Sequence, residues 1–160
     1  MRASTFALLG VVIVGACRSA ERASDSAFAQ VQRRGQTVMG VDQYTSKHVF
    51  EDLRDGGRIV LDRDDAGDTA AIRTIRAHMR DIAAAFRRGD FTAPGLVHAQ
   101  EVPGTRVMAE KRAVISYDAV ERPRGAEVRI QSSDSAAVRA IHAFLEFQRT
   151  DHRAARHESH

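Results

Sequence analysis

The chain has 160 residues, of which 24 are Lys or Arg and 21 are Asp or Glu, so its formal net charge is +3. Acidic residues are interspersed among the arginines, and the sequence has no basic stripe of the kind that holds a nucleic-acid backbone. The single cysteine excludes an internal disulfide, and no apolar run is long enough to span a bilayer.

The N-terminus has the pattern of an export signal. Arg2 supplies a positive charge, Phe6–Val14 is a short apolar run, and two small residues precede Cys17. The string Val14-Gly15-Ala16-Cys17 is similar to the bacterial lipobox, whose cysteine is lipidated and becomes the first mature residue. We therefore predict a signal peptide over residues 1–16 and attachment to a membrane through a lipid on Cys17. The predicted location is the cell envelope, in the periplasm or on the outer surface; an ordinary secretory signal with an incidental cysteine is the alternative.

The next segment differs in composition from the rest of the chain. Residues 18–35 are rich in Ser, Ala, Arg and Gln and contain few large apolar side chains. This composition favours a flexible tether that begins at the lipidated cysteine, over residues 17–35. A single domain is expected over residues 36–153, followed by a disordered tail at residues 154–160.

The first half of the domain reads as a hairpin followed by a helix. Strands are predicted at Lys47–Leu53 and Arg58–Asp62, joined by Arg54-Asp55-Gly56-Gly57, because glycine accepts the positive φ of a tight turn. A helix is predicted from Asp68, which caps it, to Arg88. Its apolar stripe at intervals of three and four consists of Ile72, Ile75, Met79, Ile82 and Phe86, and Gly89 ends it.

The second half has the same order of elements. Asp90–Thr105 contains two prolines and two glycines and is predicted to be mainly loop, with a short strand at Leu96–Gln100. Strands are then predicted at Ala113–Tyr117 and Glu127–Gln131, and a second helix starts at Asp134.

Residues 47–88 and 113–150 form an internal repeat. The string Asp68-Thr69-Ala70-Ala71-Ile72-Arg73 aligns with Asp134-Ser135-Ala136-Ala137-Val138-Arg139. Two ββα units predict an α+β domain in which a four-stranded antiparallel sheet carries two helices on one face. Convergent patterning of two amphipathic helices is the alternative explanation of the match.

The histidines are the candidate ligating residues of the domain. Imidazole together with thioether sulfur suits copper, especially Cu(I), and imidazole alone also suits zinc. The predicted metal site takes its donors from His78, His98, His142 and Met108. Met79 lies in the apolar stripe and is expected to be structural. The alternative for each histidine is a hydrogen-bonded packing role, and the tail histidines His152, His157 and His160 are expected to be solvated.

A set of residues spread over Val41 to Arg153 resembles a family of small exported bacterial proteins of unknown function. The resemblance is carried by His78-Met79-Arg80-Asp81-Ile82, Phe86, Gly89-Asp90-Phe91, Val97-His98, Pro103-Gly104, Met108, Arg124-Gly125, Ile141-His142, Phe144-Leu145, Phe147-Gln148 and Asp151-His152. Some members of that family are labelled aspartate carbamoyltransferase. That enzyme is a two-domain α/β protein with a Ser-Thr-Arg-Thr loop for carbamoyl phosphate, and this chain has no such loop. The resemblance therefore implies export and the domain limits but not carbamoyl transfer.

These patterns predict a lipid-anchored envelope protein that binds copper, zinc or another transition metal. The alternative is an envelope interaction module without a cofactor, which leaves open a protein partner or a homodimer. An enzyme is the least favoured class, because the sequence has no Gly-x-Ser-x-Gly motif and no Gly-rich phosphate loop after a strand. The one cysteine lies at the expected mature terminus, where it is no candidate for a catalytic thiol.

Overall fold

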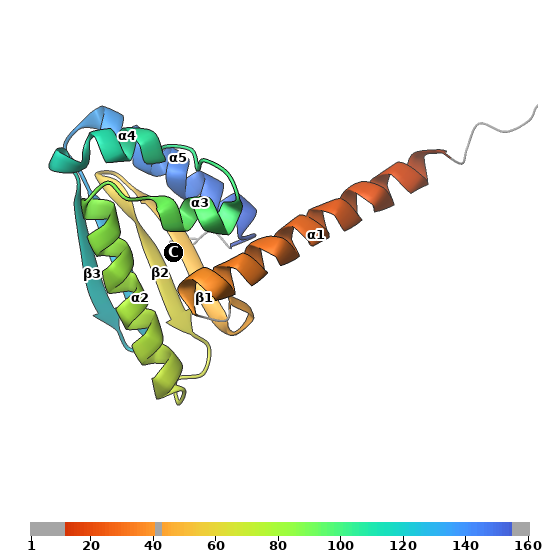
Figure 1. The fold of residues 1–160 in the computed structure, drawn as a ribbon, viewed down its shortest axis with the longest axis horizontal. Coiled ribbons are helices and arrows are strands. Elements are labelled where there is room, and N and C mark those ends of the chain that lie inside the picture. The colour runs from red at the N-terminus through yellow and green to blue at the C-terminus, as the bar shows by residue number, and fades with distance from the viewer. Residues whose placement is uncertain (1–11, 41–42, 155–160) are drawn as a thin grey trace, which may run out of the picture.

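The computed structural model describes residues 12–40 and 43–154 (Figure 1). Most of the expected signal peptide, residues 1–11, and residues 155–160 of the expected tail lie outside the described residues. Short 3-10 helices occur at Gln43–Thr45 and Arg112–Val114. The longer elements are α1 (Val12–Met39), β1 (Ser46–Leu53), β2 (Gly56–Arg63), α2 (Thr69–Arg87), α3 (Thr92–His98), α4 (Thr105–Glu110), β3 (Ser116–Arg122), β4 (Gly125–Gln131) and α5 (Ser135–Asp151).

One antiparallel sheet with the strand order β1-β2-β4-β3 forms the centre of the domain, and α2 and α5 pack on one of its faces. The predicted α+β fold, a four-stranded antiparallel sheet with two helices on one face, is confirmed. The strand order also fits two ββα units. Ile59 of β2 and Val128 of β4, which are equivalent in the repeat, are direct partners where the two units meet.

Each unit's helix covers the other unit's strands. The helix α2 packs mainly on β4 and β3, whereas α5 packs on β1 and β2. Arg76 of α2 donates to the carbonyl oxygens of Arg122 and Gly125, at 2.7 and 3.2 Å, where the β3–β4 turn begins and ends. Because the helices are exchanged in this way, neither unit buries both its sheet and its helix without the other.

The predicted helix ends are also present. Asp68 accepts the backbone N–H of Ala71 at 3.0 Å, and Asp134 accepts those of Ala136 and Ala137 at 2.8 and 2.9 Å. These carboxylates satisfy amides that lack a partner in the first turn of a helix. Gly89, with φ +77°, follows the last turn of α2 as expected.

The segment between the two units differs from the prediction. The expected strand at Leu96–Gln100 is wrong, because α3 extends to His98 and ends at Ala99 in the left-handed conformation with φ 55°. The buried residues Pro94, Val97 and His98 have helical spacing, and a proline in the first turn removes no helical hydrogen bond. The expected strand from Ala113 begins instead at Ser116, after the second 3-10 helix.

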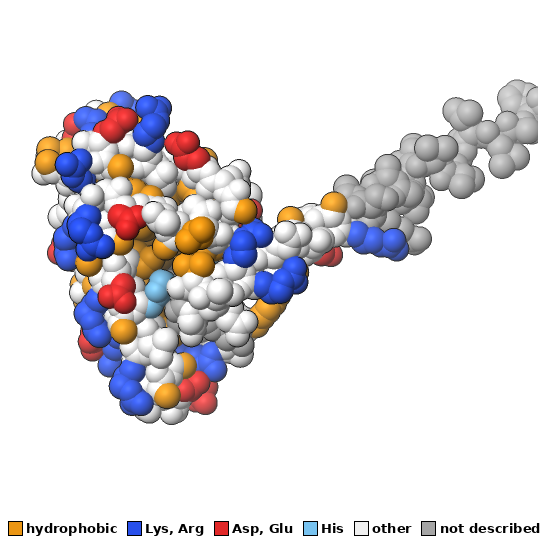
Figure 2. Space-filling model, in the orientation of Figure 1, with side chains coloured by type: hydrophobic (Ala, Val, Ile, Leu, Met, Phe, Trp, Pro, Cys, Tyr) orange, Lys and Arg blue, Asp and Glu red, His pale blue; other side chains and the backbone are white. Residues whose placement is uncertain are grey.

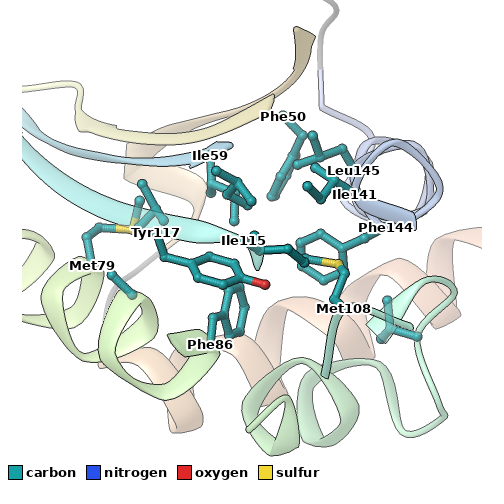
Figure 3. Close-up of a cluster of buried hydrophobic side chains, with 14 of the residues drawn as sticks. Phe50, Ile59, Met79, Phe86, Met108, Ile115, Tyr117, Ile141, Phe144 and Leu145 are labelled. Carbon is teal, nitrogen blue, oxygen red and sulfur yellow. The ribbon is translucent and has the colours of Figure 1, made fainter. Parts of the chain in front are cut away.

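The core lies between the helical layer and the inner face of the sheet (Figure 3). Phe86 stacks on Phe91 with ring centroids 4.4 Å apart and meets Tyr117 and Phe144 edge to face. Other fully enclosed side chains include Met108, Ile130, Ile141 and Leu145. The buried apolar area of these residues is the main stabilising contribution to the fold.

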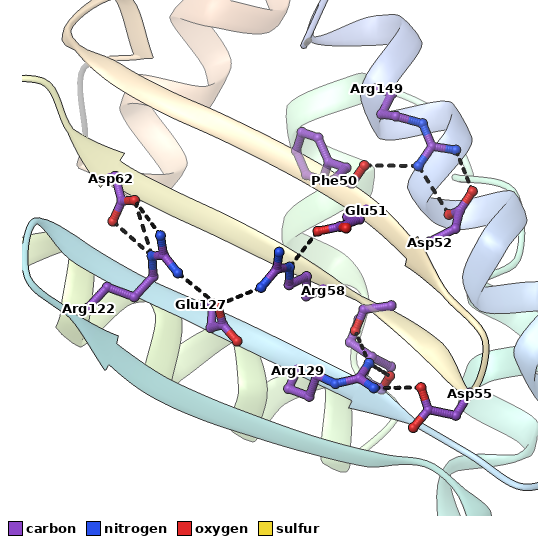
Figure 4. Close-up of polar contacts among 12 residues, drawn as sticks. Phe50, Glu51, Asp52, Asp55, Arg58, Asp62, Arg122, Glu127, Arg129 and Arg149 are labelled. Carbon is purple, nitrogen blue, oxygen red and sulfur yellow. Dashed lines mark hydrogen bonds and ion pairs between the residues drawn. The ribbon is translucent and has the colours of Figure 1, made fainter. Parts of the chain in front are cut away.

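The other face of the sheet carries a lattice of charged side chains (Figure 4). Arg58 lies between Glu51 and Glu127, at 2.6 and 3.6 Å, and Arg122 bridges Asp62 and Glu127 at 3.1 and 3.2 Å. Opposite charges on neighbouring strands stabilise a sheet modestly and keep its outer face hydrated.

Residues 18–35, expected to be a flexible tether, lie within α1 in the structure. The second half of α1 packs on α3: Val31 is 3% exposed, and the Arg34 Nε–H donates to the Val97 carbonyl at 2.6 Å. Arg153, beyond α5, pairs with Asp25 at 2.9 Å. The first half of α1 projects away from the domain (Figure 1). Within the described part of the chain, no helix is both long and apolar enough to cross a membrane.

Candidate functional site

A pocket opens between the sheet and the helices α2, α3 and α5. Its cavity volume is about 70 Å³, and its wall is mostly apolar, with Phe50, Met79 and Val97 among the lining side chains. Figure 2 shows hydrophobic side chains collected in the middle of this face of the domain, with a histidine beside them. Small-molecule sites in proteins are typically concave and apolar with a few polar groups.

Four histidines line this pocket, which we call the histidine pocket. They are His48 of β1, His78 of α2, His98 of α3 and His152, which follows α5. The four come from separate elements, so the tertiary fold brings them together. His78 and His98 belong to the predicted metal site, whereas His48 and His152 do not.

His98 is held in place by two hydrogen bonds. Its Nδ1 contacts the carboxylate of Asp151, and its Nε2 lies 2.9 Å from the side-chain oxygen of Gln148. The His98 side chain is 1% exposed. Because both ring nitrogens are engaged, neither has a lone pair directed at a metal ion.

His48 and His152 form a stacked pair. Their ring centroids are 5.8 Å apart with an angle of 7° between the planes, and His152 meets His98 edge to face at 5.0 Å. Burial lowers the pKa of His48 to about 4, although its hydrogen bond to the backbone of Ser46 opposes the shift. Burial and the neighbouring His48 and His98 lower the pKa of His152 to about 3. Both rings are therefore uncharged at neutral pH.

His78 lies on the flank of α2 at the same pocket. Burial lowers its pKa, and the negative charge of Asp81 partly offsets this effect. His48 and His152 therefore present uncharged imidazoles in an apolar wall, which suits a ligand without a formal charge.

The other two predicted metal ligands lie elsewhere. Met108 of α4 is 0% exposed within the core, and it does not line the histidine pocket. His142 of α5 bonds through Nε2 to the carbonyl oxygens of Leu53 and Gly56, at 3.0 and 2.9 Å. Both partners are acceptors, so Nε2 carries a proton and is not a metal-binding lone pair.

The position of His142 has a structural explanation in the repeat. His142 aligns with Arg76, and each residue donates to the two carbonyls that flank the hairpin turn of the other unit. His142 is thus part of the exchanged helix packing. Among residues 12–40 and 43–154, no group of three or more His, Cys, Asp or Glu is placed to hold a metal ion.

Sequence reasoning missed His48 and His152 for different reasons. His48 alternates with the inward-facing Phe50 on β1, and this period of two was a usable signal. His152 lies inside the predicted domain limits but was grouped with the tail histidines as solvated, and nothing local indicates that the end of α5 returns to β1. Comparison with protein-family models, curated proteins and solved structures gives no significant match to this chain.

Proposed function

We propose that this chain is an exported, lipid-anchored cell-envelope protein whose domain binds a small, uncharged, largely apolar molecule in the histidine pocket. The observation that carries this proposal is the apolar wall of the pocket with its buried, uncharged imidazoles. An apolar ligand gains free energy from the area that it removes from water, and an imidazole orients it through a hydrogen bond.

The envelope location is proposed from the sequence alone. A lipid on Cys17 would attach the chain at a point within α1, and the part of that helix that follows leads to the domain. Helix rather than coil between anchor and domain would hold the pocket at a more constant distance from the membrane surface.

Transition-metal binding is the second function to test. Four imidazoles line one pocket, which favours it, but both nitrogens of His98 are occupied and the rings of His48 and His152 are stacked. Because the two rings are nearly parallel, their nitrogen lone pairs lie in parallel planes and do not converge on one metal ion. The pocket is therefore better suited to an apolar molecule than to copper or zinc.

Ligand-detected NMR with indole and toluene tests the apolar site, using the full chain with Cys17→Ser to prevent lipidation. Ala93→Phe places a ring in the pocket wall and should abolish saturation transfer to both probes. Leu96→Phe is the matched control, because Leu96 of α3 is 57% exposed and does not line the pocket. Equal binding by the two variants would contradict the proposed site.

Two further measurements separate the alternatives. Metal analysis after loading with copper and zinc should find less than one equivalent bound, and a stoichiometric metal that is lost in His78→Ala would favour the metal site instead.

For the envelope location, the unaltered protein should fractionate with membranes and Cys17→Ser should not. Membrane fractionation of Cys17→Ser would contradict the lipid anchor.

A further inference from the structure

The second half of α1 packs on the domain beside the histidine pocket. The end of the helix reaches the pocket itself, because Val38 is one of its lining residues. One turn earlier, the Arg34 Nε–H donates to the carbonyl oxygen of Val97, which also lines the pocket. Docked α1 therefore supplies one part of the pocket wall and holds another part in place.

The hydrophobic core does not include α1. This helix packs chiefly on α3 and on the 3-10 helix Gln43–Thr45, and only its second half approaches the domain (Figure 1). Val31 is buried in this contact, but none of the α1 side chains that the structure describes belongs to the core between the sheet and the helices. The core can therefore stay intact when α1 leaves.

The contact between α1 and the domain is incompletely packed. A cavity of about 240 Å³ remains between α1, the start of β1 and the residues that follow α5. Gln32 is 7% exposed while its helix neighbours Gln30, Arg33 and Gln36 are exposed, so the burial of Gln32 comes from docking. Its side-chain oxygen has no hydrogen-bond partner among the described residues. Undocking returns this oxygen to water, and an unsatisfied buried group of this kind lowers the equilibrium constant for docking about fivefold or more.

The polar contacts farther along α1 are exposed. Arg153 pairs with Asp25 at 2.9 Å, donates to the Ser24 hydroxyl and lies over the ring of Phe28 at 4.7 Å. The side chains of Arg153 and Asp25 are 44% and 70% exposed. Because ion pairs in water contribute little to stability, this contact adds little to the docking of α1.

A hinge residue follows the end of α1. Gly40 has φ +64°, and a Cβ built on it would meet no atom within 4 Å. Glycine changes its backbone angles at low steric cost, and the open space around Gly40 leaves room for that change. The direction of α1 relative to the domain can therefore change at this residue.

We propose that α1 is a lid on the histidine pocket, which swings about Gly40 between a docked and an undocked position while the rest of the domain stays folded. This inference rests on the proposed function, because it concerns access to the same pocket. The docked helix encloses the apolar ligand with Val38, and the undocked helix lets the ligand enter or leave. A ligand that contacts Val38 favours the docked position, since a ligand shifts an equilibrium through its difference in affinity for the two states.

Thiol labelling tests the movement of α1. The full chain carrying Cys17→Ser has no other cysteine, so one introduced cysteine reports on its own surroundings. Val31→Cys places a thiol in the buried contact of α1, and the matched control Val128→Cys places one in the core, at a residue that is 0% exposed. In native buffer, dithionitrobenzoate should label Val31→Cys at least about 100-fold faster than Val128→Cys, because local opening requires less free energy than global unfolding. Equal rates would overturn the proposal, since α1 would then open only with the whole domain.

Gln32→Leu tests whether the unsatisfied oxygen keeps α1 loosely docked. In the Val31→Cys chain it should slow labelling about fivefold or more, because leucine fills the same contact without an unpaired polar atom. Gln36→Leu is the matched control: Gln36 is an exposed residue of the same helix, and its substitution should leave the labelling rate unchanged. Equal slowing in the two variants, or none in Gln32→Leu, would overturn the loosely docked lid.

Toluene links the lid to the pocket. Saturating toluene should slow the labelling of Val31→Cys about fivefold, and Ala93→Phe, which fills the histidine pocket, should remove this effect. Toluene that binds in the NMR experiment without slowing the labelling would overturn the lid. Absence of toluene binding would contradict the proposed function instead, while the labelling rates of Val31→Cys and Val128→Cys still decide whether α1 undocks.

Discussion

The individual polar residues of the interior divide into those with partners and those without. Both ring nitrogens of His98 and Nε2 of His142 have hydrogen-bond partners on neighbouring elements. The Tyr117 hydroxyl, by contrast, is buried without a hydrogen-bond partner among the described residues. Substituting a residue whose buried polar group has no partner tests directly how that group affects stability.

Removing the Tyr117 hydroxyl should stabilise the protein. The side chain is 0% exposed in the core, and its hydroxyl lies among apolar side chains (Figure 3). Tyr117→Phe keeps the ring and removes the unsatisfied group, so we expect the free energy of unfolding in urea to rise by about 1 kcal/mol. Arg73→Ala, at an exposed residue of α2, is the control and should change it by less than about 0.5 kcal/mol. A loss of stability in Tyr117→Phe would mean that the hydroxyl has a bonded partner.

The buried histidines should make the protein sensitive to mild acid. Burial holds the pKa of His48 at about 4 and that of His152 at about 3, against about 6.5 in the unfolded chain. Below pH 6.5 the unfolded chain binds more protons, so the free energy of unfolding falls as the pH falls from 7 toward 4. At pH 5 the expected loss is about 2 kcal/mol for each of the two histidines.

The measurement is urea unfolding at pH 7 and pH 5, with His48→Phe as the comparison. The variant should lose the share of the pH dependence that belongs to His48, about 2 kcal/mol between pH 7 and pH 5. Asp55 and Asp134, whose side-chain hydrogen bonds lower their pKa to about 2, do not interfere, because their contribution is lost only below about pH 4. An unchanged pH dependence in His48→Phe would contradict the assignment.

At the scale of the elements, close packing of α4 against α5 depends on one residue without a side chain. Gly104 precedes α4 with φ +84°, and a Cβ there would lie 2.1 Å from the carbonyl oxygen of Ala140 in α5. Short helices such as α3 and α4 are stabilised mainly by tertiary packing rather than by their own propensity. The absence of a side chain at Gly104 thus lets α4 pack closely on α5.

Gly104→Ala should therefore be strongly destabilising. Both the positive φ and the backbone contact oppose a methyl group, and we expect a loss of about 2 kcal/mol or more. Gly95→Ala is the matched control, because its nearest neighbour, the Gln100 carbonyl oxygen, would be 3.7 Å from the new Cβ. Thermal unfolding of both variants gives the comparison, and similar melting temperatures would refute the packing argument.

At the scale of the whole molecule, exchanged helices join the two repeat units. Arg76 and His142 occupy equivalent repeat positions and donate to equivalent carbonyls of the opposite hairpin. The helix α1 adds a third contact surface by packing on α3. The second half of α1 is thus packed against the two-unit domain.

The equivalence of Arg76 and His142 can be tested by replacement. His142→Ala leaves two carbonyl oxygens without their donor and should lower the free energy of unfolding by about 2 kcal/mol. His142→Arg places at that position the residue type of the other unit and should recover at least half of the loss. Arg73→Ala, at an exposed residue of α2, is the control and should have little effect in the same urea measurement. Failure of the arginine to restore stability would show that the two positions are not interchangeable.

The sequence by itself determined the local structure of the two units. Alternation in the strands, the spacing of the apolar stripe, the aspartate caps and Gly89 all depend on neighbours within a few residues, and the structure contains them. The internal repeat also predicted that the sheet has four strands, two from each unit. The short apolar segment Leu96–Gln100 was misread because so short a segment fits either period, and packing decided it.

The tertiary structure alone decided which polar residues share a site. His48, His78, His98 and His152 lie far apart in the sequence and meet because α2 and α5 cross to the opposite units and α3 closes over them. Gln32, Ser46 and His48 line one cavity because α1 packs back on the domain. Long-range contacts of this kind leave no periodic signal in the chain, since a histidine that ligates, one that clamps a turn and one that lines a pocket have the same local context.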